Sequence, residues 1–272
     1  MTNARDIAPI PVSRTRAVSR VGRDGARPDT RALAEETPVA LIHDATTTAV
    51  MMATPADIED FAVGFSLTEG IIADPAEIRE LEVAAGDLGV EARMWLAKPR
   101  GEALAARRRL LAGPTGCGLC GVESLAEALR PTPLVGKGFR VTAEEIWAAL
   151  DALPAAQTLG AVTRAVHAAG WWTPGVGFAA VREDVGRHNA LDKLVGALAR
   201  AAQPCAPGLL VLTSRVSVEM VQKAAVLGAQ VLVAVSAPTT LAIATAERAG
   251  MTLIGVARPD SFEVFTRGDR VV

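Results

Sequence analysis

Two of the chain's three cysteines stand three positions apart in a glycine-rich stretch, Gly113-Pro114-Thr115-Gly116-Cys117-Gly118-Leu119-Cys120-Gly121. Four glycines and a proline disfavour helix and strand, because glycine loses much backbone entropy on folding and proline has no amide donor. We therefore expect an exposed, mobile loop with Cys117 and Cys120 at its tip.

A Cys-x-x-Cys pair has three chemical uses. Its thiolates can bind zinc, cycle between dithiol and disulfide, or carry a sulfur atom as a persulfide that the second thiol helps to release. A zinc knuckle that merely pins a turn is the structural alternative. The nine residues by themselves leave all of these hypotheses open.

The redox compartment bears on that choice. The N-terminus lacks the apolar stretch of a secretion signal, and no run approaches about 18 uninterrupted apolar residues. We expect a cytoplasmic protein that neither crosses nor binds a membrane, in which a Cys-x-x-Cys is reactive or metal-bound rather than a structural disulfide. Cys205, alone among prolines and alanines, is expected in a connecting segment and not in a functional site.

The composition is that of a globular protein. The chain has 272 residues, of which 50% are apolar and 21% charged, so it forms one large or two ordinary domains. Its formal charge of -2 gives no field that would attract nucleic acid, and no nucleic-acid partner is expected. A bound nucleotide would have to be held by local groups.

The first half of the chain mixes strand and helix patterns. Val39, Leu41 and His43 alternate as in a strand, whereas Ile58, Phe61 and Phe65 recur at helical spacing. The patterns predict a partly disordered arm over 1–30, a strand pair over 37–52, a helix over 57–67, mixed strand and loop over 78–96, and helices over 102–111 and 123–129. A boundary near 136–138 then separates a smaller N-terminal α+β domain (31–137, with the sulfur loop at 113–121) from a second domain (138–272).

The second half alternates more regularly. Thr142 and Glu145 form a capping box before an amphipathic helix, and short wholly apolar runs are bounded by helical patterns. We predict strands over 162–172, 177–181, 209–212, 231–235 and 253–256, a last strand through 265, and helices over 142–153, 189–199, 217–227 and 239–248. Such runs favour an α/β domain with a largely parallel sheet between helix layers.

Polar residues gather where these strands end. They are Glu183, Asp184, Arg187, His188 and Asn189; Ser214, Arg215 and Ser217; Ser236 and Thr239; and Arg258, Asp260 and Ser261. Ligands bind at that edge of an open α/β sheet, where helix N-termini offer free amides to phosphate. Turns and helix caps explain each group singly, but together the groups predict a pocket for a phosphorylated or nucleotide-like molecule, with Arg215, Lys223 and Arg258 available for its charge.

Familiar nucleotide enzymes are disfavoured. No Walker loop or Gly-x-Gly-x-x-Gly fingerprint stands at a strand-to-helix turn. A zinc deaminase needs His-x-Glu before its Cys-x-x-Cys, but Ala169 follows His167 at that spacing and the cysteines lie upstream. His167 is expected to be structural or to contact a ligand, and His188 either takes part in chemistry or caps the helix after it.

Taken together, four motifs closely resemble the FdhD family of sulfur carrier proteins, or sulfurtransferases, required for formate dehydrogenase activity. They are Thr115-Gly116-Cys117-Gly118-Leu119-Cys120-Gly121; Glu183-Asp184-Val185-Gly186-Arg187-His188-Asn189-Ala190-Leu191-Asp192-Lys193; Ser214-Arg215 with Glu219-Met220-Val221-Gln222-Lys223; and Ser236-Ala237-Pro238-Thr239. The resemblance runs from about Arg31 to Thr266. One departure is Arg164-Ala165, where the family usually has a glycine pair.

The resemblance implies a function. A cysteine desulfurase would load a persulfide onto Cys117, with Cys120 as its partner, and the sulfur would pass to the bis-guanine-dinucleotide molybdenum cofactor before that cofactor enters formate dehydrogenase. The second domain would be similar to the cytidine deaminase fold without its zinc, and two copies would form a homodimer. The cofactor is expected at Val256, Ala257, Arg258, Pro259, Asp260 and Ser261, with Ser214, Arg215, Ser236, Thr239, His188 and Asn189 around them.

Two other hypotheses remain. A zinc enzyme with Cys117, Cys120 and a histidine as ligands would hydrolyse or deaminate a nucleotide. A dithiol redox protein is the third, although thioredoxin-type Cys-x-x-Cys motifs open a helix after a strand, whereas these cysteines stand among glycines.

Overall fold

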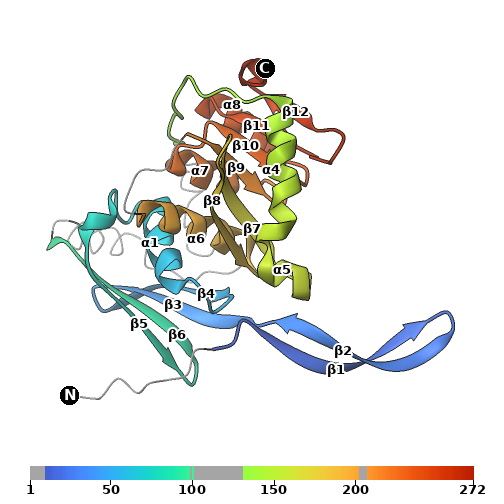
Figure 1. Cartoon of the computed structure of the whole chain (residues 1–272). Coiled ribbons are helices and arrows are strands. Elements are labelled where there is room, and N and C mark those ends of the chain that lie inside the picture. The colour runs from blue at the N-terminus through green and yellow to red at the C-terminus, as the bar shows by residue number, and fades with distance from the viewer. Residues whose placement is uncertain (1–9, 99, 101–130, 202–206) are drawn as a thin grey trace.

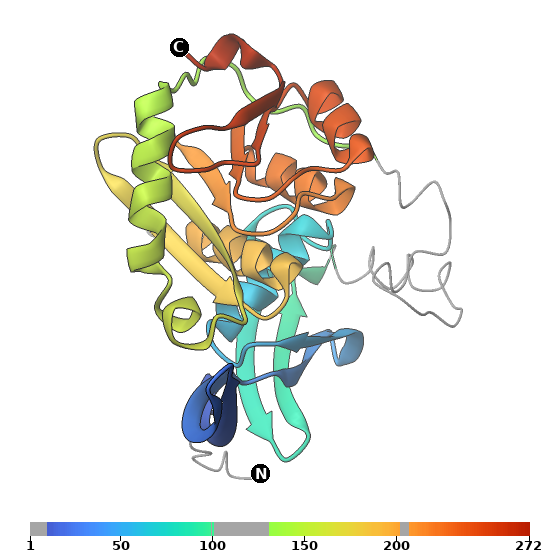
Figure 2. The same ribbon diagram turned by 90° about the vertical axis from the view of Figure 1, so that its right-hand side faces the viewer.

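The chain folds into a long hairpin and two sheets with helices packed on them. The computed structural model describes residues 10–98, 100, 131–201 and 207–272. Within these residues there is a two-stranded hairpin, a four-stranded sheet and a six-stranded sheet (Figure 1). The hairpin and the four-stranded sheet lie on the same side of the six-stranded part (Figures 1 and 2).

The hairpin replaces most of the predicted disordered arm. Strands β1 (Ser13–Gly22) and β2 (Gly25–Ala34) pair antiparallel along their whole length. The two-residue turn between them is followed by Gly25, whose φ of 117° suits glycine. Composition suggested disorder because the segment has no core. It nevertheless forms an antiparallel ladder, in which backbone groups of the two strands pair.

The four-stranded sheet and one helix form the first part of the body. Strands β3 (Thr37–His43), β4 (Thr46–Ala53), β5 (Ile78–Gly86) and β6 (Gly89–Leu96) are arranged in the order β4-β3-β6-β5, and η1 (Pro75–Glu77) precedes β5. Helix α1 (Ile58–Thr68) packs Phe61 and Phe65 against Val39 and Leu41 on one face. The predicted strand pair and helix are thus confirmed, and 78–96 is a hairpin.

The second part contains a helix that the sequence did not predict. Helix α4 (Ala143–Ala156) begins at the predicted capping box of Thr142 and Glu145. Helix α5 (Thr158–Thr163) lies where the sequence suggested the start of a strand. Its first amides, those of Leu159 and Gly160, donate to the Glu183 carboxylate at 2.8 Å. A capping group so distant in sequence leaves no local signal.

The six-stranded sheet is mixed rather than largely parallel. Its strands are β7 (His167–Thr173), β8 (Gly177–Asp184), β9 (Leu209–Leu212), β10 (Val231–Ala234), β11 (Thr252–Gly255) and β12 (Glu263–Thr266), in the order β12-β11-β10-β9-β7-β8. Only β9, β10 and β11 are parallel neighbours. Short connections join β7 to β8 and β11 to β12, and these permit only antiparallel pairing.

Helices cover both faces of this sheet. Helix α4 packs on the face that includes Leu209, Val231 and Ile254. The opposite face carries α6 (Arg187–Ala199), α7 (Val218–Leu227) and α8 (Thr240–Ala249), and η2 (Gly268–Arg270) follows β12. The predicted helices of the second half are therefore confirmed. No helix in the described ranges is long and apolar enough to cross a bilayer.

The two parts meet where α1 crosses α6, which we call the joint. A Cβ atom on Gly64 would lie 1.7 Å from the Asp192 carbonyl oxygen, and one on Gly196 would lie 1.8 Å from the Asp60 carbonyl oxygen. The two backbones therefore touch, and neither position has room for a methyl group. Asp60 also accepts from Arg182 Nη2 at 2.7 Å, which ties α1 to β8.

We expect Gly196→Ala to lower the free energy of unfolding by about 3 kcal/mol or more, because the methyl group must separate two backbones. Gly86→Ala is the matched control. The nearest described atom to its Cβ would be the Gly89 carbonyl oxygen at 4.0 Å, so the change should stay within about 0.5 kcal/mol. Urea unfolding followed by circular dichroism measures both. Equal stability of the two variants would contradict this account of the joint.

Candidate functional site

The cysteines lie outside the described residues. This applies to Cys117, Cys120 and the whole stretch 113–121, as well as to Cys205 and the predicted helices at 102–111 and 123–129. Their roles therefore stay predictions. In the part of the chain that the structure describes, no group of three or more His, Cys, Asp or Glu side chains could hold a metal ion.

The four polar groups do meet at one edge of the six-stranded sheet, which we call the rim. Strand β7 runs antiparallel to both β8 and β9, so β8 ends at the same edge as β9, β10 and β11. Hydrogen bonds join the loops after β9, β10 and β11: the Val235 amide donates to the Leu212 carbonyl at 2.9 Å, and the Val256 amide to the Ser236 carbonyl at 3.2 Å. The four strand ends thus share one edge although the sheet is mixed, and the role of their residues as a cofactor site stays a prediction.

The loop after β11 is the most constrained part of the rim. Val256 has a φ of 52°, in the left-handed region that a β-branched residue rarely adopts. Two backbone hydrogen bonds hold the turn: the Ala257 amide donates to the Ala234 carbonyl at 3.1 Å, and the Arg258 amide to the Ser261 carbonyl at 2.7 Å. Ala257 is buried, whereas Arg258, Pro259, Asp260 and Ser261 are exposed. Strain of this kind concentrates at functional sites.

Arg258 lies across the rim. Its Nη1 donates to the Ala257 carbonyl at 2.9 Å and to the Val235 carbonyl in the neighbouring loop. The exposed guanidinium is thereby held over the ends of β10 and β11. A guanidinium has five donors in a rigid fork, so an arginine held in this way can also present donors to a phosphate.

Of the other residues predicted to bind the cofactor in these loops, some make hydrogen bonds within their own loop or helix and others are exposed to solvent. Thr239 caps α8, accepting from the Ala242 amide at 3.3 Å, which is the structural alternative noted from the sequence. Ser214 is 3% exposed and donates to the Arg215 carbonyl at 3.0 Å. Arg215 itself is exposed and Ser236 partly so. Only Arg215 of this set adds charge to the rim.

Helix α6 brings two further residues to the rim. It begins at Arg187 after Gly186, and no side chain of the described residues caps it. His188 lies within the first turn and does not cap the helix. Arg187 Nε is buried and has no hydrogen-bond partner among the described residues. The sequence motif contained Arg187, but nothing in its local pattern separated it from a surface arginine.

The histidines at the rim are held neutral. Burial, together with the charges of Arg187 and Lys223, lowers the pKa of His188 from 6.5 to about 4. Burial and Arg187 also lower the pKa of His167, which begins β7 and pairs with Asp184 across the strands. The positive charge of the rim near pH 7 therefore comes from arginine and not from histidine.

Asn189 and Lys223, which the sequence assigned to the pocket, belong to buried networks instead, as does the strand-end residue Asp184. Asn189 donates its amide to the Met52 carbonyl at 2.8 Å and to Asp184 at 3.0 Å. Lys223 forms an ion pair with Asp192 at 2.9 Å and with Glu69 at 2.9 Å, which leaves it unavailable for a ligand's charge. Both tie α6 or α7 to the first part, and the partners are too distant in sequence to be predicted.

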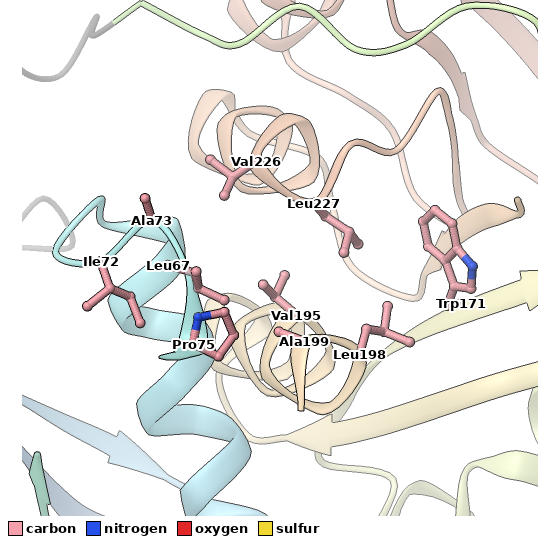
Figure 3. A pocket seen from close by; sticks show the side chains of 10 residues that line it. All are labelled: Leu67, Ile72, Ala73, Pro75, Trp171, Val195, Leu198, Ala199, Val226 and Leu227. Atoms are coloured by element: carbon pink, nitrogen blue, oxygen red, sulfur yellow. The ribbon is translucent and has the colours of Figure 1, made fainter. Parts of the chain in front are cut away.

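A cavity elsewhere in the molecule has the wrong chemistry for a nucleotide. It measures about 430 Å³ and lies between α1, α6, α7 and β7. The side chains that line it are apolar and include Leu67, Ile72, Trp171, Val195 and Leu198 (Figure 3). Phosphate groups need donors and positive charge, so the rim and not this cavity is the candidate site.

Fold and rim together define a class of protein: a two-part α/β protein whose sheet edge gathers arginines, neutral histidines and helix N-termini, with a Cys-x-x-Cys stretch in the same chain. The model of the FdhD/NarQ family matches residues 34–272. The chain belongs to this family. The family indicated by the sequence motifs is therefore confirmed.

Similar proteins cover nearly the whole chain. The sulfur carrier protein FdhD of Agrobacterium fabrum is 52% identical over 269 residues, which is 97% of this chain and 99% of that protein. The protein of the same name from Brucella abortus is 51% identical over 249 residues, or 91% and 93% of the two chains. A crystal structure of a formate dehydrogenase accessory protein from Desulfotalea psychrophila is 26% identical and has a TM-score of 0.76, covering 96% of this chain and 100% of that one.

The pKa of His188 predicts a pH dependence of stability. The unfolded chain binds a proton near pH 6.5 and the folded chain near pH 4, so stability is fully present above pH 6.5 and falls as the pH drops towards 4. The loss is up to about 3 kcal/mol. Urea unfolding between pH 7.5 and pH 4.5 should show a shallower dependence for His188→Gln. An unchanged slope would mean that His188 is not buried as described.

Proposed function

We propose that the protein is a persulfide sulfur carrier, a sulfurtransferase that serves formate dehydrogenase maturation. Its relatives are named sulfur carrier protein FdhD, and this chain has the Cys-x-x-Cys stretch that such chemistry needs. The observation that carries the proposal is the rim, where Arg187, Arg215 and Arg258 lie at the ends of strands and helices suited to an anionic ligand.

The first transfer requires a donor and one thiolate. The Cys117 thiolate would attack the terminal sulfur of a persulfide on a cysteine desulfurase. A sulfur–sulfur bond forms at Cys117 as the bond to the desulfurase cysteine breaks, and that cysteine leaves as a thiolate. The sulfur moves without net oxidation. A glycine-rich segment suits this step because the persulfide must leave one active site and enter another.

The second transfer uses the second thiol. The Cys120 thiolate would attack the Cys117 sulfur, so that a disulfide forms and the terminal sulfur leaves as hydrosulfide to the molybdenum centre. A cellular dithiol would then reduce the disulfide. These steps suit a reducing compartment, and we place the protein in the cytoplasm.

The substrate at the rim would be the bis-guanine-dinucleotide molybdenum cofactor. The residues present fit such a molecule, because exposed arginines and helix N-termini match its pyrophosphates and the rim offers hydroxyls and carbonyls to guanine. Val256 to Ser261 would contact it, with Ser214, Arg215, Ser236, Thr239 and His188 near them. Arg187, whose buried Nε has no hydrogen-bond partner within the described ranges, joins this set.

Fold and assembly complete the proposal. We interpret the six-stranded part, with helices on both faces, as a zinc-free relative of the cytidine deaminase fold. The partners would be a cysteine desulfurase, formate dehydrogenase and a second copy of the chain.

We expect Cys117→Ala to abolish formate dehydrogenase maturation in cells that lack their own copy of this protein, with unfolding unchanged. Cys205→Ala is the matched control and should keep full activity. After incubation with a desulfurase and cysteine, mass spectrometry should show additions of about 32 Da per sulfur in the control only. Full maturation by Cys117→Ala would refute the carrier function, and stoichiometric zinc lost with that cysteine would assign a metal site instead.

We expect Arg258→Ala to weaken binding of guanosine diphosphate about tenfold, since one charge-assisted contact is lost. The control is Arg140→Ala. Arg140 is exposed, and the neighbouring Val141 bridges to Val271, away from the rim loops, so its affinity should not change. Isothermal titration calorimetry measures both. Unchanged affinity for Arg258→Ala would place the nucleotide elsewhere.

A further inference from the structure

The hairpin of β1 and β2, which we call the arm, is almost entirely exposed. Nearly every residue of its two strands is open to solvent, and it extends away from the body (Figure 1). Val21 is 76% exposed and Leu33 46% exposed. A two-stranded hairpin alone is at best marginally stable in water, so an ordered arm of this length indicates a surface that it packs against.

One face of the arm is a stripe of arginines. The cross-strand register places Arg16 opposite Arg31 and Arg20 opposite Arg27, with Arg14 on the same face. Arg14 and Arg20 form ion pairs with Glu35 and Asp29, and Arg31 Nη2 donates to the Thr163 carbonyl of α5 at 3.4 Å. Arg16 and Arg27 have no carboxylate partner among the described residues. Like charges directly opposite each other destabilise a hairpin. An anionic surface packed on this stripe would therefore stabilise the hairpin.

The arm and the rest of the chain have formal charges of opposite sign. Residues 13–34 contain six arginines and two aspartates, a formal charge of +4 in a chain whose total is -2. The rest of the chain therefore carries -6. A second copy of this chain is in consequence an anionic partner for the arm, since oppositely charged patches attract.

The four-stranded sheet offers the matching surface. Helix α1 covers one face, and the opposite face, which we call the outer face, is formed by the alternate side chains. It carries Glu80, Glu82 and Glu91, with Arg93 between them in ion pairs to Glu82 and Glu91. A hollow of about 490 Å³ opens on it, lined in part by Pro38, Ala40, Val50 and Ala84.

This outer face is also unusually apolar for a surface in water. Val50 is 61% exposed, Met52 46% and Trp95 36%, and the register places Met52 opposite Pro38 and Val50 opposite Ala40. The solvent face of such a sheet is ordinarily polar. Exposed apolar side chains bordered by carboxylates are typical of a protein-binding surface.

We propose that the arm of one copy packs on the outer face of the four-stranded sheet of a second copy, and the reverse, in a two-fold dimer. Arm and sheet extend in different directions from the junction near residues 34–37, on the same side of the six-stranded part (Figure 1). A two-fold axis beside this junction therefore brings each arm towards the other copy's sheet. The inference rests on the proposed second copy and names its contact surface.

The size of the contact suits a stable dimer. Ten residues of strand span about 33 Å, and two strands with their side chains are about 10 Å wide. Two arms would bury on the order of 1,300 Å² in all, within the range of specific protein interfaces. Because the contact joins opposite charges at an exposed surface, salt should weaken it.

The experiment measures dimerisation of the full chain by sedimentation equilibrium at low salt. The wild type should be a dimer, and the double variant Arg16→Glu with Arg27→Glu should dissociate at least tenfold more readily. The matched control, Lys137→Glu with Arg140→Glu, makes the same charge change at exposed sites outside the arm and should remain dimeric. Circular dichroism confirms that each variant is folded.

A complementation test locates the acceptor surface. Glu80→Lys with Glu82→Lys should also weaken the dimer, whereas an equimolar mixture with the arm variant should form heterodimers, because both contacts then join opposite charges again. A monomeric wild type, an arm variant as dimeric as the control, or a mixture that stays monomeric would each overturn the proposal. Since formate dehydrogenase maturation is assayed separately, failure of this surface is distinguishable from failure of the carrier function.

Discussion

The contact between Gly64 on α1 and Gly196 on α6 is the constraint on which the arrangement depends. It lets two helix backbones touch, and the Lys193–Asp184 ion pair, at 2.6 Å with both side chains fully buried, closes the joint beside it. Lys193 also donates to the Thr54 carbonyl, at the end of the first sheet. Helix α6 thus runs from Arg187 at the rim to Gly196 at the joint, so the two features share one rigid element.

Two kinds of lysine and arginine side chains occur around the joint and the rim: buried or partly buried ones paired with carboxylates, and exposed ones at the rim. Lys193, Lys223 and Arg182 are neutralised by carboxylates inside the structure, where a lone charge would be very costly. Arg215 and Arg258 remain exposed at the rim. Since both histidines there have lowered pKa values, the rim depends on guanidinium groups, which stay charged at any physiological pH. Binding of an anion there should vary little with pH.

Sequence patterns predicted those helices and strands whose signals come from residues close together in the chain. The helical stripe of α1, the capping box of α4 and the apolar runs of β9 to β11 all have short-range signals, and four strand-end groups were enough to predict the rim. Contacts between residues far apart in the sequence could not be predicted from local patterns. Glu183 caps α5 and Asp192 binds Lys223, each from a distant element. The direction of β7 likewise follows from the whole sheet and not from its own residues.

The arm shows why composition misjudges order. A segment of arginines and small residues has no core, so its composition suggests disorder. Backbone pairing can still contribute order, because alternate residues of an antiparallel pair exchange amide-to-carbonyl hydrogen bonds whatever their side chains are. Side chains then decide what the ladder binds. Opposed arginines cost stability in the isolated hairpin. Glu35 and Asp29 offset part of this cost within the chain, and the proposed contact with a second copy would offset more by placing further carboxylates opposite the arginines.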